Sequence, residues 1–165
     1  MDIQSSYRKI IEIMKNILEE IAARTRERIA KEKSCISVSE LENRIQEVNK
    51  NAGKRITLLQ ALQKDGMSYI CEVKKASPSK GLIAPDFPYL AIAKEYEQAG
   101  ASAISCLTEP FYFQGADQYL REIAAAVQIP VLRKDFTVDE YMIYQAKSLG
   151  ASAVLLFAPF WMTEN

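Results

Sequence analysis

The chain has 165 residues, of which 48 % are hydrophobic and 25 % charged, and its formal net charge is zero. This composition is typical of a globular protein, and a neutral chain offers no electrostatic footprint for nucleic acid or for an acidic membrane surface. Histidine is absent. Its absence excludes Ser-His-Asp triads, Cys-His pairs and histidine-ligated zinc, so acid–base chemistry falls to Glu, Asp, Lys, Tyr or Cys.

Residues 1–66 are predicted to form a helical extension without strands. Apolar residues recur at helical spacing within 7–33, and the charged part of this stretch, RTRERIAKEK, is expected to be solvated. Ser37-Val38-Ser39-Glu40 has the pattern of a capping box, which predicts a second helix from about residue 38. A third helical stretch covers about 55–65. The apolar positions of the first helix are Ile10, Ile13, Met14, Ile17, Leu18, Ile21 and Ala22.

From Met67 onward, residues 67–165 alternate between strand-like and helical segments. Pro88 opens the first helical segment, and Thr137-Val138-Asp139-Glu140 has the pattern of a capping box for the last. Strands that alternate with helices predict βα units and a parallel sheet. The strands are predicted near 69–75, 102–108, 130–136 and 152–158.

A short repeat supports this interpretation. A-G-A-S-A-I (99–104) recurs as L-G-A-S-A-V (149–154), so Gly100 and Gly150 lie two βα units apart and are expected to end helices in the left-handed conformation. Without a Gly-rich dinucleotide loop, such units fit a (βα)8 TIM barrel better than a Rossmann sheet. A closed barrel needs about 250 residues. We therefore expect a half barrel of about four βα units, with two apolar edge strands prone to association.

Strand parity separates the charged residues from the apolar ones. Side chains alternate along a strand, so Glu72 and Lys74 share one face of the first strand, opposite Val73. By the same parity, Lys134 and Phe136 share a face of the third strand. In a barrel, the charged residues would point inward near the C-terminal mouth, where barrel enzymes have their active sites.

The cysteines and the lengths of the apolar runs indicate where in the cell the protein is expected. Cys35, Cys71 and Cys106 lack the spacing of metal ligands and predict buried free thiols in a reducing cytosol. No apolar run reaches the ~18 residues of a membrane span, and the N-terminal MDIQSSYRKI lacks the apolar region of a signal peptide. We expect a soluble, cytoplasmic protein that binds neither membranes nor nucleic acid.

Several motifs occur in the order found in indole-3-glycerol-phosphate synthases, a family of TIM-barrel enzymes with a helical N-terminal extension, which the chain resembles from about residue 8 to 157. These motifs are EVKKASPSKG (72–81), AISCLTE (103–109), FYFQG (111–115), PVLRKDF (130–136) and GASAVLL (150–156). The resemblance implies a carbon–carbon lyase of tryptophan biosynthesis that uses no metal or organic cofactor. Its substrate would be 1-(2-carboxyphenylamino)-1-deoxyribulose 5-phosphate, which undergoes ring closure, decarboxylation and dehydration.

The resemblance also implies roles for particular residues. Lys134 matches the general acid that protonates the substrate ketone. Glu72 matches an acidic residue that is paired with the lysines and acts in dehydration, and Lys74 matches a lysine that contacts the anionic substrate. The remaining residues are implied to bind substrate, the last three as an apolar pocket for the anthranilate ring: Ser77, Pro78, Phe113, Phe136 and Leu155.

The sequence departs from the family at two points. Phe87 stands where the family usually has an aspartate before the proline, which removes a helix cap. The family's second catalytic glutamate, its asparagine and its phosphate-binding loops have no counterpart in these residues. The isolated chain is therefore expected to be inactive or weakly active.

Other interpretations stay open at this point. The charged pair of the first strand also fits a salt bridge at a solvated strand end, and SPSKG (77–81) fits an ordinary surface turn. The chain could serve as an association module that pairs with itself or with a complementary half barrel. Another phosphosugar barrel, such as phosphoribosylanthranilate isomerase, is a further alternative.

Overall fold

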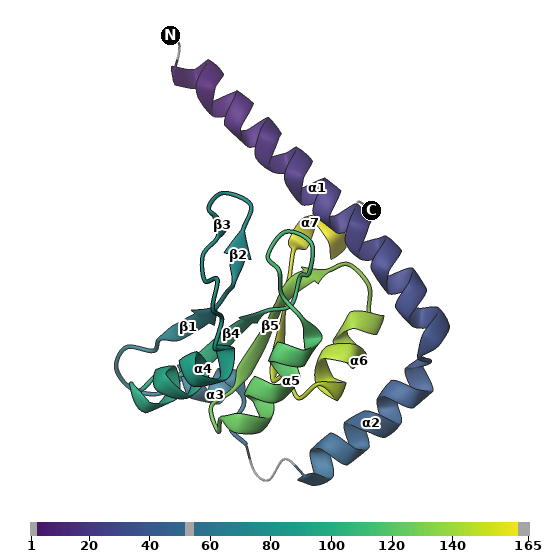
Figure 1. Cartoon of the computed structure of the whole chain (residues 1–165), viewed down its shortest axis with the longest axis vertical. Coiled ribbons are helices and arrows are strands. Elements are labelled where there is room, and N and C mark those ends of the chain that lie inside the picture. The colour runs from purple at the N-terminus through teal and green to yellow at the C-terminus, as the bar shows by residue number, and fades with distance from the viewer. Residues whose placement is uncertain (1–2, 52–54, 162–165) are drawn as a thin grey trace.

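The computed structural model describes the backbone of residues 3–51 and 55–161 and the side chains of residues 17–50, 55–158 and 160–161. Four strands form one parallel sheet in the order β1-β4-β5-β6. The strands are β1 (Ile70–Val73), β4 (Ala103–Leu107), β5 (Val131–Thr137) and β6 (Ala153–Leu156). Three helices connect them in turn and lie on one face of the sheet (Figure 1): α4 (Tyr89–Gln98), α5 (Asp117–Ala126) and α6 (Tyr141–Ser148). The predicted alternation and parallel sheet are confirmed.

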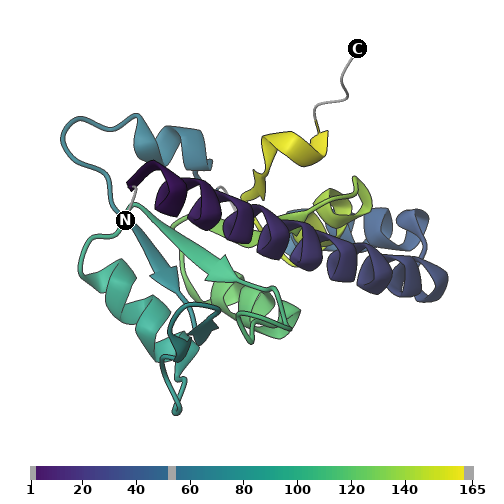
Figure 2. The same cartoon turned by 90° about the horizontal axis from the view of Figure 1, so that it is seen from above.

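Within the described residues, the regular elements of the N-terminal part are all helices. It consists of α1 (Ile3–Cys35), α2 (Val38–Asn51) and α3 (Leu58–Leu62). Ser37 Oγ accepts a hydrogen bond from the backbone N–H of Glu40 at 3.2 Å, so the predicted start of the second helix is confirmed. The side chains of Ile10, Ile13 and Met14 lie outside the described residues. Seen from above, α1 crosses over the carboxyl ends of the strands (Figure 2).

The expectation that the charged stretch of α1 is solvated holds for most of its side chains but is wrong for one stripe, which packs against α2, α6 and β5. Thr25 and Ile29 are buried, and Ile29 packs in a cluster with Leu41 and Met142. The guanidinium of Arg28 forms an ion pair with the side chain of Asp135 at 2.9 Å. These residues recur about once per helical turn and so form a stripe on one face of α1. In the sequence, the charged residues on either side obscure this stripe.

The predicted capping box at Thr137 is also wrong. Thr137 pairs with Leu156 and is the last residue of β5. The helix begins four residues later at Tyr141, whose backbone N–H donates to Asp139 Oδ1 at 2.9 Å. Pairing with β6 extends the strand through the threonine, and the aspartate side chain bonds to the first turn of the helix instead.

The repeated glycines behave as predicted. Gly100 and Gly150 have φ values of 89° and 92°, the left-handed region that glycine adopts without strain. Each follows a helix, and each is followed by a buried alanine, Ala101 or Ala151, before the next strand. The two turns, two βα units apart, thus lead from α4 into β4 and from α6 into β6 in the same way.

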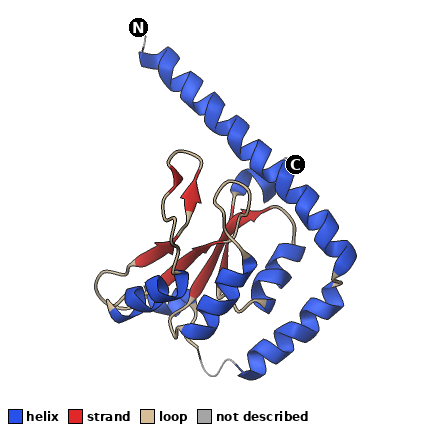
Figure 3. Cartoon of the chain, viewed as in Figure 1, coloured by secondary structure: helices blue, strands red, loops and turns tan. Residues whose placement is uncertain are grey.

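The core lies between the strands of the sheet, red in Figure 3, and the helices α4–α6, blue in the same figure. Val73 belongs to this core, which agrees with the predicted strand parity, and so does Cys106 of β4. Burial raises the pKa of the Cys106 thiol to about 12, although the nearby Arg133 opposes this shift. Cys71 is half-buried and Cys35 is exposed, so the prediction of buried thiols fails for the cysteine at the end of α1. All three are free thiols.

Two short elements complete the described residues. A hairpin of β2 (Ala76–Ser77) and β3 (Gly81–Leu82) rises from the carboxyl end of β1, and α7 (Ala158–Trp161) follows β6. Among the helices described, none has the length and apolar character required to cross a lipid bilayer.

Candidate active site

A carboxylate and two ammonium groups meet at the carboxyl edge of the sheet. Lys74 Nζ donates to Glu72 Oε1 at 2.6 Å, and Lys134 Nζ lies 3.3 Å from Glu72 Oε2. Glu72 pairs with Ser105 of β4, and Lys134 pairs with Leu107 of β4, two residues further along. The side chains of β1 and β5 therefore meet across the end of β4. The three predicted catalytic residues therefore form one cluster, and their side chains are 30–36 % exposed. They are reachable by a ligand without being fully solvated.

The charge state of this cluster follows from its contacts. Partial burial opposes ionisation of Glu72, but the hydrogen bond from Lys74 and the positive charge of Lys134 outweigh it. The pKa of Glu72 therefore lies below its ordinary value of 4.5. At neutral pH the carboxylate is ionised, so it can accept a proton.

The lowered pKa of Glu72 predicts a specific pH dependence of stability. A carboxyl whose pKa is lower in the folded state stabilises the fold above the pKa of the unfolded state, and this contribution is lost as pH falls through the folded pKa. Glu72→Gln should therefore be less stable than wild type at pH 7, and the difference should shrink below about pH 4.5. Urea denaturation of both proteins between pH 3 and 7 measures it. A difference that is independent of pH would contradict the pairing.

Apolar residues lie beside the charged cluster on β5 and β6. The ring of Phe136 is only 6 % exposed and stacks on the ring of Phe157, with centroids 4.7 Å apart and planes 9° apart. Leu155 is half-buried on β6. Because Leu132 pairs with Ala153, alternate residues of the two strands share one face of the sheet. The stacking of Phe157 on Phe136 was not predicted, although Phe157 lies two residues after Leu155 and is therefore expected on the same face of the sheet.

The other predicted residues lie on connections. Ser77 is buried in the β2–β3 hairpin, and its Oγ accepts from the backbone N–H of Lys80 at 3.2 Å. Pro78 is exposed at the tip of the hairpin, and Phe113 is half-buried in the loop after β4. Among the described residues, none of these three contacts Glu72 through a hydrogen bond. The structure thus places them after the carboxyl ends of β1 and β4 without joining them to the cluster.

Two buried polar groups near the site were missed at the sequence level. Glu109 is fully buried, two residues after the end of β4, and its side chain accepts hydrogen bonds from three backbone N–H groups of its own loop. The buried Arg133 bonds to the carboxylate of Asp135 at 3.4 Å and to Thr108 Oγ1 at 3.0 Å, on the opposite face of β5 from Lys134. A charged residue at an outward parity position was the available signal, because such a position normally carries an apolar side chain.

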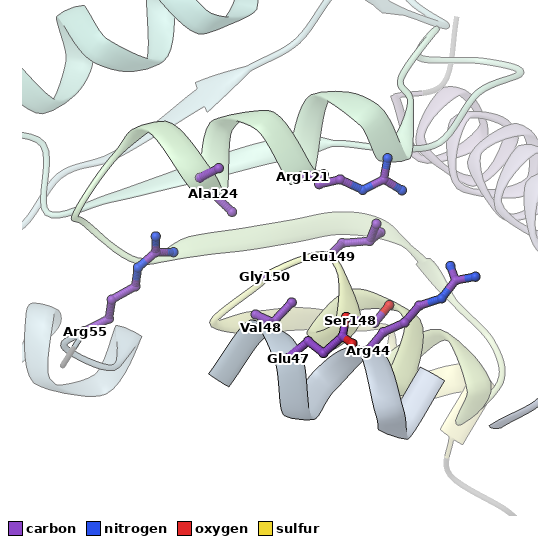
Figure 4. A pocket seen from close by; sticks show the side chains of 10 residues that line it. Arg44, Glu47, Val48, Arg55, Arg121, Ala124, Ser148, Leu149 and Gly150 are labelled. Atoms are coloured by element: carbon purple, nitrogen blue, oxygen red, sulfur yellow. The ribbon is translucent and has the colours of Figure 1, made fainter. Parts of the chain in front are cut away.

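A separate hollow of about 650 Å³ lies at the opposite end of the sheet, between α2 and the ends of α5 and α6. Arg55 approaches it from one end, and Arg44 and Arg121 from the other (Figure 4). Arg44 is already paired with Glu40 of its own helix. The arginines do not converge on one point, and the hollow is remote from the charged cluster. Among the described residues, no group of three or more His, Cys, Asp or Glu side chains is placed to hold a metal ion.

Consecutive βα units with an acid–base cluster at the carboxyl edge of their parallel strands place the chain in the TIM-barrel class. The sequence profile of the family described as "Indole-3-glycerol phosphate synthase" matches residues 18–164. The chain belongs to this family.

Curated relatives with the same name are similar over most of the chain. "Indole-3-glycerol phosphate synthase" of Ruminiclostridium cellulolyticum is 50 % identical over 150 residues, which are 90 % of this chain and 56 % of the relative. The proteins of that name from Lacticaseibacillus paracasei and Thermoanaerobacter pseudethanolicus are 51 % and 46 % identical, each over 140 residues and 85 % of this chain, and over 53 % and 52 % of the relative. The chain thus spans about half the length of the curated relatives it matches.

Proposed function

We propose that this chain supplies acid–base and ring-binding residues of an indole-3-glycerol phosphate synthase, a carbon–carbon lyase of tryptophan biosynthesis. The observation that carries the proposal is the sharing of one carboxylate, Glu72, by lysines from two different strands. Family membership supports the same reaction. The substrate would be 1-(2-carboxyphenylamino)-1-deoxyribulose 5-phosphate.

In this proposal, Lys134 acts first. A ring carbon of the substrate bonds to the ketone carbon while the ammonium of Lys134 gives a proton to the ketone oxygen. The bond to the ring carboxylate then breaks, carbon dioxide leaves, and its electron pair restores the aromatic ring. An apolar wall that includes Phe136 and Leu155 favours this step because it excludes water.

Loss of water follows. The carboxylate of Glu72 takes the proton from the neighbouring carbon as the indole double bond forms, and it passes this proton to the hydroxyl that arose from the ketone, which leaves as water. The lowered pKa of Glu72 keeps it in the basic form that this step requires. Lys74, at 2.6 Å from Glu72, holds the carboxylate in place and offers a positive charge to the anionic substrate.

The test is an assay of indole-glycerol phosphate formation with two proteins. One is the 165-residue chain, and the other is a fusion of this chain to the remainder of the R. cellulolyticum relative beyond its match. We expect little or no turnover by the chain alone and clear turnover by the fusion. A folded but inactive fusion, beside an active R. cellulolyticum enzyme, would refute the proposal.

A second candidate role is association through the sheet edges. Ile70 on β1 and Leu156 on β6 are 45 % and 50 % exposed, and these strands are the first and last of the sheet order. Exposed apolar edge strands pair readily with further strands. Sedimentation of the chain at several concentrations tests self-association, and a monomer at all concentrations would count against it. We also propose a cytoplasmic location, which the three free thiols support.

A further inference from the structure

The loop of residues 109–115, which follows β4, is built around a buried carboxylate. Glu109 is 0 % exposed, and its Oε1 accepts from the backbone N–H of Phe111 at 2.9 Å. Its Oε2 accepts from the N–H groups of Tyr112 and Phe113 at 2.7 and 3.0 Å. Its backbone carbonyl accepts from the N–H of Gly115 at 2.8 Å. Glu109 therefore accepts hydrogen bonds from four backbone N–H groups of its own loop.

The chemistry of this contact requires a carboxylate. All three partners of the side chain are N–H donors, and a carboxylate offers acceptor lone pairs on both of its oxygens and no donor. An amide would set its NH₂ group against at least one N–H, whichever way it turned. Glutamine at position 109 would therefore keep the shape of the side chain and lose part of the contact. Buried N–H groups left without an acceptor are costly, so the loop would loosen.

The loop is also held from outside. The guanidinium of Arg24 on α1 lies 5.7 Å from the ring centroid of Phe111 and 5.5 Å from that of Tyr112. Tyr112 Oη donates to a carboxylate oxygen of Glu20, also on α1. Within the described residues, Phe113 takes part in no such aromatic or cation–π pair. The first two rings of the loop thus contact α1, whereas Phe113 has no such partner among the described residues.

Gly115 closes the loop against the end of β4. A Cβ at this position would lie 2.5 Å from the backbone oxygen of Leu107 and 2.7 Å from backbone carbon atoms of Thr108. The loop therefore folds back directly onto the strand that carries it. Because Gly115 is packed against the strand, a movement of Glu109 has to be accommodated by the residues between Glu109 and Gly115.

We propose that Glu109 is a positioning residue: its buried carboxylate fixes loop 109–115 and so sets the Phe113 ring against the aromatic ring of the substrate. The part that concerns the substrate rests on the proposed function. The fixing of the loop does not, because it follows from the hydrogen bonds alone.

Glu109→Gln tests the inference by two readouts. In the 165-residue chain, deuterium exchange of the amides of residues 111–113 should accelerate by about tenfold or more, the effect of losing one or two buried hydrogen bonds. In the fusion enzyme, KM for the substrate should rise by about tenfold while kcat changes by less than about threefold, as expected for lost binding. Glu109→Asp keeps both acceptors and should restore part of the amide protection.

Glu122→Gln is the matched control. Glu122 accepts from Tyr89 Oη and from the side-chain amide of Gln118, both at 2.7 Å, and takes no part in loop 109–115. The same chemical change there should leave the three amides and KM unaltered. Unchanged exchange of residues 111–113 in Glu109→Gln would overturn the fixing of the loop. Faster exchange with unchanged KM would overturn the role of Glu109 in positioning the ring. A wild-type fusion that does not bind the substrate would overturn that role and would also refute the proposed function.

Discussion

Lys134→Ala is expected to lower kcat of the fusion enzyme by about 10²–10⁴-fold, the usual contribution of a positioned general acid. The ammonium lies 3.3 Å from the carboxylate of Glu72 at the carboxyl edge of the sheet. Alanine removes the proton donor and leaves the rest of the cluster in place. Because the side chain is 36 % exposed, its removal opens no buried cavity, and the protein should still fold.

Lys80→Ala is the matched control. Lys80 is exposed at the turn of the β2–β3 hairpin, and the structure records only its backbone N–H in a hydrogen bond. Its substitution should change kcat by less than about threefold, as expected for a surface position. Initial rates at saturating substrate, with thermal melting of each variant, measure the pair. Equal losses in the two variants would contradict the assignment of the proton donor to β5.

The charged cluster could be predicted because strands impose a strict period. Side chains alternate along β1 and β5, so Glu72, Lys74 and Lys134 had to lie opposite the apolar residues that pack on the helices. Parallel pairing then brings the carboxyl ends of the strands to one edge. Neither step depends on details of loops. For this reason the lysines were placed correctly relative to the sheet from local pattern alone.

Residues held by long-range partners could not be predicted in this way. Arg28 is buried only because Asp135, 107 positions later, lies under it. Nothing within its own helix distinguishes it from the solvated arginines beside it. Likewise, the loop after β4 has no period, and its shape depends on the buried carboxylate of Glu109. The pattern at Thr137 misled for a related reason, since pairing with β6 overrides a local capping signal.

Asp135→Ala should lower the free energy of unfolding by about 3–5 kcal/mol, the cost of removing one partner from a buried ion pair. The side chains of Asp135 and Arg133 are both fully buried. Asp135 Oδ2 accepts from Arg28 Nη2 at 2.9 Å and from Thr108 Oγ1 at 2.8 Å, and Oδ1 accepts from the backbone N–H of Phe136 at 2.8 Å. Alanine leaves each of these donors without its acceptor.

Glu40→Ala removes one partner of an exposed pair and serves as the control. Glu40 and Arg44 lie one turn apart on α2 with side chains about half exposed, so its loss should cost less than about 1 kcal/mol. Chemical denaturation of the 165-residue chain, followed by circular dichroism, measures both variants. A loss for Asp135→Ala no larger than that for Glu40→Ala would show that the buried pair contributes nothing beyond its hydrophobic surroundings.

A double-mutant cycle separates the two cations that share Asp135. Arg28 comes from α1, whereas Arg133 lies on β5 and is also held by Asp117 at 2.9 Å and by Gln145 at 2.8 Å. Arg133 therefore keeps partners when Asp135 is removed, and Arg28 loses the ion pair that joins α1 to the sheet. We expect the coupling between Arg28→Ala and Asp135→Ala to account for a large part of the loss.

Because the same helix also fastens loop 109–115 through Arg24 and Glu20, a weakened contact at Asp135 should loosen that loop as well. Faster amide exchange at residues 111–113 in Arg28→Ala would then link the buried ion pair to the site, and unchanged exchange would confine the effect to stability.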